Sequence, residues 1–65
     1  MRIILNGKPQ QVSESRLDAV LLECGYDQPA IATAVNQAIV HAEDRAQTSL
    51  QEGDQLEVLA PIGGG

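Results

Sequence analysis

The spacing of apolar residues along the chain predicts one helix and five short strands. Leu17, Val20, Leu21 and Cys24 recur at i, i+3, i+4 and i+7, a spacing that forms one apolar stripe along a helix. Short apolar or alternating segments predict strands, and these segments are 2–5, 8–12, 31–36, 38–41 and 55–60. The polar segment 42–47 is expected to form a helical turn or a loop. The predicted order of elements is therefore ββαβββ.

Turn and capping residues mark where these elements begin and end. Asn6-Gly7 is a strong hairpin signal because both residue types tolerate a positive φ, and a second turn is expected at Asn36-Gln37. Ser15 is expected to cap the helix, and Asp18 suits the positive end of the helix dipole. Gly25 is placed to end the helix in a left-handed turn.

The predicted helix and strands each have one apolar face that has to be buried. One amphipathic helix packed on one mixed sheet buries all of these faces with few elements, which predicts the α+β class. The residues predicted to form the core are Ile3, Leu5, Val12, Leu17, Val20, Leu21, Cys24, Ile31, Val35, Leu50, Leu56 and Val58.

Length and charge limit the classes of function. A chain of 65 residues has room for one small domain, which we expect at 1–60, followed by a flexible tail at 61–65. The formal net charge of −5 argues against nucleic acid and anionic lipid as ligands, because both are bound by clustered positive charge. An acidic surface suits a basic protein partner instead.

The remaining composition argues against a membrane, a disulfide and a metal. No apolar run approaches the roughly 20 residues of a membrane span, and the N-terminus is a poor signal peptide, so we expect a cytoplasmic protein. The single cysteine, Cys24, is expected to be a packed thiol on the buried helix stripe. His41 with Glu43 and Asp44 is interpreted as a solvated surface, so no metal site is predicted.

The glycines at the end of the sequence carry the strongest chemical signal. Three of the six glycines are Gly63, Gly64 and Gly65, and they follow a predicted strand without a polar linker. A glycine tail is often flexible padding, but it also fits a channel too narrow for side chains. Residues 61–65 would reach roughly 16 Å beyond the sheet. A partner that uses ATP could then convert the Gly65 carboxylate to an acyl-adenylate, and a sulfur nucleophile could displace AMP to leave a thiocarboxylate.

Four segments together resemble a known family. They are 1–7, 32–40, 52–58 and 62–65, and the last ends in Gly64-Gly65. In order and spacing they are similar to the ThiS-type sulfur-carrier proteins of thiamine biosynthesis, which have the ubiquitin-like β-grasp fold. The sequence departs from the family pattern at Gln37, where glycine is usual, and at Thr33, where a larger apolar residue is frequent. Near Arg45, where basic or aromatic residues are common, only this arginine remains.

The resemblance implies a carrier that is a cosubstrate of other enzymes and not itself an enzyme. A ThiF-type activating enzyme would adenylate Gly65 with ATP, and a cysteine desulfurase would be the ultimate source of the sulfur. The thiazole synthase ThiG would take that sulfur to build the thiazole ring. ATP and magnesium would belong to the activating enzyme, so this chain is expected to bind no cofactor. Ile62, Gly63 and Gly64 would lie in the channel of the activating enzyme.

A docking patch for these partners is predicted on the sheet. Ile4 and Leu59 are expected to face away from the core on neighbouring strands and to lie close together, backed by the small residues Ala32 and Ala34. Three alternatives remain open from the residues alone. The chain could be a molybdopterin-type sulfur carrier, a ubiquitin-like modifier that joins Gly65 to a lysine, or a non-reactive β-grasp interaction module.

Overall fold

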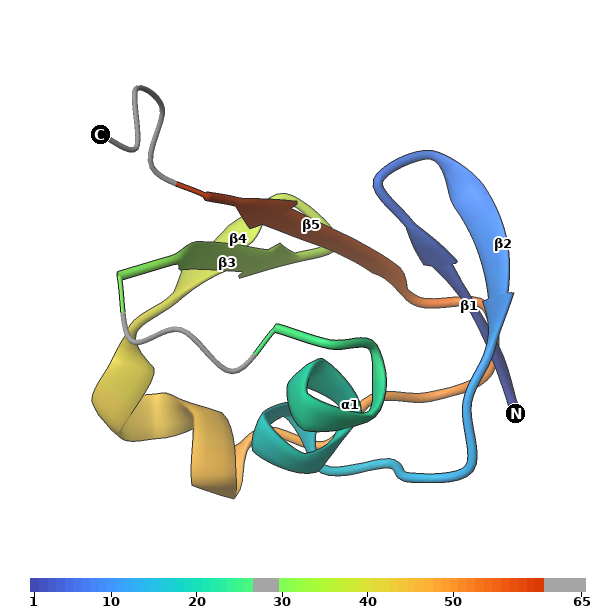
Figure 1. The fold of residues 1–65 in the computed structure, drawn as a ribbon, viewed down its shortest axis with the longest axis horizontal. Helices are drawn as coiled ribbons and strands as arrows, with labels where there is room; N and C mark the ends of the chain where they lie inside the picture. Colours follow the sequence, from blue (N-terminus) through green and yellow to red (C-terminus); the bar gives the residue numbers. More distant parts are fainter. Residues whose placement is uncertain (27–29, 61–65) are drawn as a thin grey trace.

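The structure is a computed structural model that describes residues 1–26 and 30–60. The segment 27–29 and the predicted tail at 61–65 lie outside the described residues. The elements follow the predicted order ββαβββ (Figure 1). They are β1 (Arg2–Leu5), β2 (Lys8–Gln11), α1 (Leu17–Glu23), β3 (Ala32–Val35), β4 (Ala38–Val40), the 3-10 helix η1 (Ala42–Gln47) and β5 (Gln55–Leu59).

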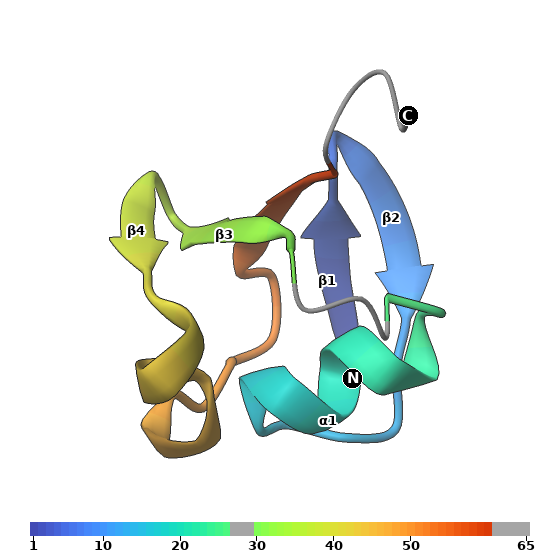
Figure 2. The same cartoon turned by 60° about the vertical axis from the view of Figure 1, so that its left-hand side comes forward.

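The five strands form one mixed sheet in the order β2-β1-β5-β3-β4. The hairpin β1–β2 and the hairpin β3–β4 are not paired with each other in the sheet, because β5 lies between them. It pairs in parallel with β1 and antiparallel with β3. Helix α1 crosses one face of the sheet, and no helix within the described residues covers the other face (Figures 1 and 2). This is the β-grasp arrangement, and it confirms the predicted α+β class.

Both hairpin turns form where the sequence predicts them. Asn6 and Gly7 have φ angles of 49° and 84°, and Asn36 and Gln37 have φ angles of 50° and 72°. Two consecutive residues with positive φ form the turn type whose twist matches that of antiparallel strands. The turns therefore set the register of both hairpins, which pairs Leu5 with Lys8 in the first and Val35 with Ala38 in the second.

The predicted N-cap of the helix is wrong by one residue. Ser15 does not cap α1, because the main chain at this point pairs with a distant segment. The Ser15 carbonyl accepts a hydrogen bond from Leu50 N at 2.7 Å, and Leu17 N donates to Thr48 O at 2.8 Å. Arg16 therefore stays extended at the N-cap position with a ψ of 134°, and α1 begins at Leu17.

The predicted end of the helix is confirmed. Gly25 has a φ of 91° and follows the C-cap residue Cys24. Its N–H donates to Leu22 O at 3.1 Å, while Tyr26 N donates to Leu21 O at 2.8 Å. This pair of bonds is the Schellman motif, which satisfies the last carbonyls of a helix.

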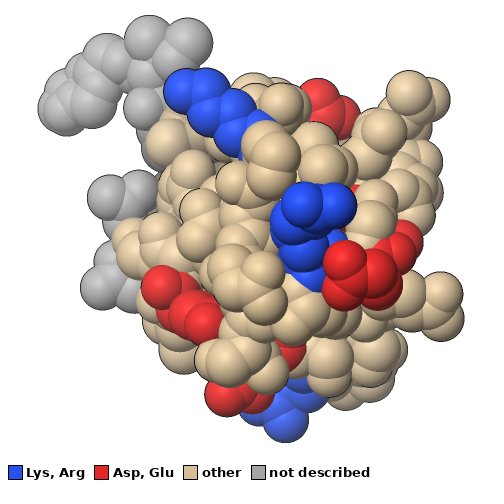
Figure 3. Space-filling model, turned by 90° about the vertical axis from the view of Figure 1, so that its right-hand side faces the viewer, with Lys and Arg blue, Asp and Glu red and all other residues tan. Residues whose placement is uncertain are grey.

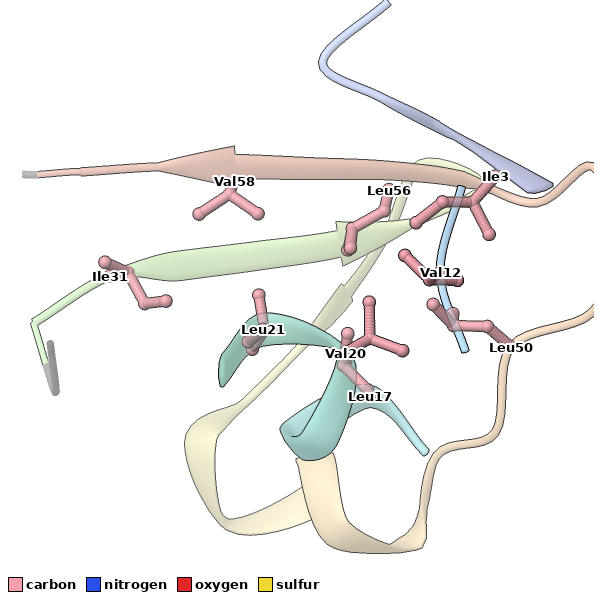
Figure 4. Close-up of a cluster of buried hydrophobic side chains, with 9 residues drawn as sticks. All are labelled: Ile3, Val12, Leu17, Val20, Leu21, Ile31, Leu50, Leu56 and Val58. Atoms are coloured by element: carbon pink, nitrogen blue, oxygen red, sulfur yellow. The ribbon is translucent and has the colours of Figure 1, made fainter. Parts of the chain in front are cut away.

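The core lies between α1 and the sheet and contains the residues that the pattern predicts. Nine apolar side chains are buried together, and they are Ile3, Val12, Leu17, Val20, Leu21, Ile31, Leu50, Leu56 and Val58 (Figure 4). The other three predicted core residues, Leu5, Cys24 and Val35, are partly buried and pack against this cluster. With Leu56 and Val58 inward, the alternate residues of β5 point to the uncovered face of the sheet.

Among residues 1–26 and 30–60, no helix has the length and apolar character needed to cross a membrane. The cytoplasmic location stays a prediction.

Candidate functional site

The uncovered face of the sheet carries the most exposed apolar side chains near the end of β5. Leu59, predicted as a docking residue, is the last residue of this strand and is 72% exposed. It pairs with Ala32 of β3, and Ala34 pairs with Glu57. Because alanine side chains are short, they leave room beside Leu59 on this face.

That room is a shallow depression of about 180 Å³. It is lined by residues of β3, β4 and β5, which are Ala32, Thr33, Ala34, Ile39, Glu57 and Leu59. We call this set the outer-face depression. Ile39 closes it on the β4 side, where it pairs with Ala34 and is 73% exposed. Two large exposed apolar side chains thus flank a floor of small ones, which is a shape that receives an apolar side chain of another protein.

Ile39 lines the outer-face depression, and the sequence pattern did not predict its place there. It lies in a three-residue edge strand, Ala38–Val40, in which every residue is apolar. Without alternation, the pattern does not distinguish an inward from an outward position. The predicted turn at Asn36-Gln37 could have indicated the position of Ile39, because this turn fixes the hairpin register, which pairs Ile39 with Ala34.

Ile4 does not lie beside Leu59, so the predicted proximity of these two residues is wrong. The parallel register pairs Ile4 with Gln55, which is four residues before Leu59, about 13 Å along β5. Ile4 is partly buried, whereas the neighbouring Ile3 is fully buried in the core. The structure therefore brings Leu59 and Ala34 together and leaves Ile4 at the other end of β5.

Among the described residues that line the outer-face depression, the charged one is Glu57. Elsewhere the charges are mixed: on the side that carries β1 and β2, separate basic side chains lie near acidic ones without a continuous patch (Figure 3). The chain has four Lys and Arg residues against nine Asp and Glu.

Two other groups that the sequence singled out do not line the outer-face depression. Cys24 packs against the core, and its burial, with a smaller contribution from the charge of Glu23, raises the pKa of the thiol. A raised pKa keeps the thiol protonated and a weak nucleophile. In the described part of the chain, no three His, Cys, Asp or Glu side chains are placed to hold a metal ion, and His41 is exposed.

The strand that leads to residues 61–65 is held by an unexpected side chain. The amide group of Asn6 accepts a hydrogen bond from Val58 N at 2.9 Å and donates one to Val58 O at 3.4 Å. The sequence predicts Asn6 only as a turn residue, because its contact with Val58 spans 52 positions of the chain. The predicted tail residues Ile62, Gly63, Gly64 and Gly65 themselves lie outside the described residues.

Comparisons with known proteins match the whole length of the chain. The ThiS family model matches residues 3–65. The sulfur carrier protein ThiS of Escherichia coli (strain K12) is 36% identical over 66 residues, an alignment that covers all of both chains. A crystal structure of the thiamine biosynthesis protein ThiS from Geobacter metallireducens superposes with a TM-score of 0.84 and 29% identity, again over all of both chains.

Thiazole synthases are also similar to this chain. The thiazole synthase of Paramagnetospirillum magneticum is 38% identical over 66 residues, and that of Magnetococcus marinus is 36% identical. Each alignment covers all of this chain, which spans only 20% of the length of either thiazole synthase. A family match over residues 3–65, together with a full-length relative at 36% identity and the shared β-grasp fold, identifies the family. The chain belongs to the ThiS family.

Proposed function

We propose that this chain is a sulfur carrier for thiamine biosynthesis that works through the carboxylate of Gly65. The observation that carries the proposal is the full-length match to the sulfur carrier protein ThiS of Escherichia coli. The family match also runs through residue 65, so it includes the glycines at 63–65. In this proposal the domain at 1–60 is the body that partners recognise, and residues 61–65 are the segment that enters their active sites.

The chemistry takes place on the last carbon of the chain in two steps. First, an oxygen of the Gly65 carboxylate attacks the α-phosphate of ATP, so that pyrophosphate leaves and an acyl-adenylate forms. A sulfur nucleophile then attacks the carbonyl carbon, and AMP leaves. Hydrosulfide gives the thiocarboxylate directly, whereas a persulfide gives an acyl disulfide that a second thiol reduces to the thiocarboxylate.

In these reaction steps this chain supplies the carboxylate, and the partner proteins supply the other reactants. A ThiF-type activating enzyme binds ATP and magnesium, and a cysteine desulfurase provides the sulfur. A ThiG-type thiazole synthase receives the sulfur for the thiazole ring. The similarity of the whole chain to part of two thiazole synthases supports this last partner. The chain itself is a cosubstrate and binds no cofactor.

The outer-face depression is the proposed docking surface for these partners. Leu59 and Ile39 are nearly three-quarters exposed, and the depression between them lies at the end of β5 from which the chain continues toward residue 61. A partner that covers this surface would therefore hold the carrier close to the segment that it has to bind. Glu57 favours a partner with a basic residue opposite it. Ile4 lies at the other end of β5 and would contribute only to a larger interface.

Intact mass spectrometry tests the proposed function. The purified chain is incubated with ATP, the activating enzyme and a sulfur donor. We expect the mass to rise by the replacement of one oxygen with sulfur, and the change to depend on ATP. An isopeptide adduct to another protein would identify a modifier instead. An unchanged mass with partners that charge another ThiS protein would refute the proposal.

Replacing Gly64 with valine tests the role of the tail. We expect Gly64→Val to reduce the rate of adenylation about tenfold or more, because a branched side chain does not fit a channel shaped for glycine. The melting temperature should be unchanged. Gly64→Ala is the graded control and should reduce the rate less. A normal charging rate for the valine variant would contradict the narrow channel.

Replacing Leu59 with glutamate tests the docking surface. We expect Leu59→Glu to weaken binding to the activating enzyme by about 1–2 kcal/mol, a roughly 5- to 30-fold rise in Kd measured by calorimetry. Leu22→Glu is the matched control, because Leu22 is 64% exposed on α1 and the charge change is the same. Equal effects of the two variants would show that net charge, and not the outer-face depression, governs binding.

A further inference from the structure

We infer that Asn6 is a positioning residue for the reactive terminus. Its side-chain amide holds Val58 and thereby sets the direction in which the chain leaves the sheet after Leu59. The inference rests on the proposed function, since it concerns how Gly65 is delivered to the activating enzyme.

The parallel ladder between β1 and β5 is short. Ile4 N donates to Asp54 O at 2.9 Å, and Asn6 N donates to Leu56 O at 2.9 Å. A further hydrogen bond between the main chains of β1 and β5 would form only if β1 continued in the same direction beyond Asn6. The chain instead reverses at Asn6-Gly7 and returns as β2. The main chain of β1 therefore stops pairing while β5 continues to Leu59.

The side chain of Asn6 provides the missing rung. Its Oδ1 accepts from Val58 N at 2.9 Å, and its Nδ2 donates to Val58 O at 3.4 Å. A carboxamide presents one acceptor and one donor in the same plane as a peptide group does, so it substitutes for a residue of the neighbouring strand. Asn6 is exposed, yet both ends of its amide bind one residue of β5.

Val58 is consequently fixed on several sides. Thr33 of β3 pairs with it across the sheet, and its side chain is 5% exposed in the core. The Asn6 amide adds the contact on the β1 side, seven positions before Gly65 in the sequence. Without this contact, the end of β5 would be paired only with β3. More conformations of the end of β5 would then compete with the one that a partner binds, and the partner would have to order it on binding.

The turn of the second hairpin offers a matched control. Asn36 also has a positive φ of 50°, and its Oδ1 accepts from the main-chain N–H of Gln55 at 2.9 Å. This bond has the same length and the same kind of partner as the Asn6 bond, but it holds the start of β5. Glycine tolerates the positive φ at both positions, so Asn6→Gly and Asn36→Gly each remove one amide without straining a turn.

The experiment compares adenylation kinetics of the full-length variants with the activating enzyme. For Asn6→Gly we expect the KM for the carrier to rise about fivefold, the equivalent of one hydrogen bond, with kcat near the wild-type value. For Asn36→Gly we expect an unchanged KM despite a comparable fall in melting temperature. Hydrogen exchange should become faster at the Val58 amide in the first variant and at the Gln55 amide in the second.

A third variant tests which hydrogen bond matters. Asn6→Asp keeps the acceptor of the 2.9 Å bond and loses the donor of the longer one. Its KM should therefore lie between those of the wild type and Asn6→Gly. A KM equal to that of Asn6→Gly would contradict a role for the Val58 N–H bond.

The possible failures are distinguishable. If the wild type is charged and the two glycine variants have the same KM, Asn6 is merely structural and the inference is wrong, while the proposed function stands. The inference is also wrong if Val58 exchange is unchanged in Asn6→Gly. If the wild type is not charged at all, the proposed function fails and the inference fails with it.

Discussion

Individual residues explain two of the departures from the family pattern. Thr33, which replaces a larger apolar residue, is only 2% exposed. Its hydroxyl donates to Val40 O at 2.8 Å and accepts from Arg45 Nε at 3.3 Å, so the buried oxygen is satisfied. Arg45 also donates to Ile31 O at 2.7 Å and thus ties η1 to the start of β3. Thr33 and Arg45 therefore belong to one group of hydrogen bonds that joins β3, β4 and η1 in a largely apolar region.

The third departure, Gln37, leads to a prediction about stability. Its φ of 72° is costly for a residue with a Cβ atom, whereas glycine adopts it freely. We expect Gln37→Gly to raise the free energy of unfolding by about 0.5–1 kcal/mol. This value is the difference between the backbone strain that the substitution relieves and the larger conformational entropy that glycine loses on folding. Chemical denaturation of both proteins measures this difference. A loss of stability would show that the Gln37 side chain contributes more than its strain costs.

At the scale of elements, one carboxylate fastens α1 to the loop before it. Glu23, the last residue of α1, accepts hydrogen bonds from Ser13 N and Ser13 Oγ, both at 2.8 Å, and from Glu14 N at 3.1 Å. The bonds from Ser13, followed by the bond from Glu14, lower the pKa of Glu23. The loop and the helix are thereby linked by a carboxylate that accepts these hydrogen bonds more strongly when it is ionised.

This link predicts a dependence of stability on pH. Because the pKa of Glu23 is lower in the folded state than in the unfolded state, its contribution to stability is present above the unfolded value of about 4.3 and is lost progressively as the pH falls from there through the lower, folded value. We expect the melting temperature of the wild type to fall more steeply between about pH 5 and pH 3 than that of Glu23→Gln. Scanning calorimetry across this range measures both slopes. Parallel slopes would show that other carboxylates account for the acid sensitivity.

The elements also show which features a sequence can predict. The turns at Asn6-Gly7 and Asn36-Gln37 and the end of α1 at Gly25 depend on the φ preferences of adjacent residues, and all three were predicted correctly. The start of α1 depends on pairing between residues 15–17 and residues 48–50, which lie far apart in the chain. Local capping preferences therefore point to Ser15, while the tertiary contact places the first helical residue at Leu17.

At the scale of the whole molecule, the stripe and alternation patterns predicted the core, while strand register decided the candidate site. Alternation in β5 correctly places Leu56 and Val58 inward and Leu59 outward. Adjacency of β1 and β5 was also expected, but the distance between Ile4 and Leu59 depends on how far one strand is shifted along the other. No local pattern encodes this shift, because the hydrogen bonds that set it join residues about 50 positions apart, such as Ile4 and Asp54.

A small core makes the whole molecule sensitive to a single cavity. Leu21 is 3% exposed, so we expect Leu21→Ala to lower the free energy of unfolding by about 2–5 kcal/mol. The neighbouring Leu22 is 64% exposed, and Leu22→Ala should change it by less than about 0.5 kcal/mol. Urea denaturation of both variants measures the contrast. Similar losses would mean that helix propensity, and not core packing, dominates at α1.

The central place of β5 has a consequence for biosynthesis. The strand that joins the two hairpins follows both of them in the sequence, so a nascent chain that stops before Gln55 has two separate hairpins and no continuous sheet. Such a fragment lacks Leu56 and Val58 and cannot close its core. Folding of this domain must therefore wait until β5 has been synthesised. Products truncated before β5 remain open to proteases.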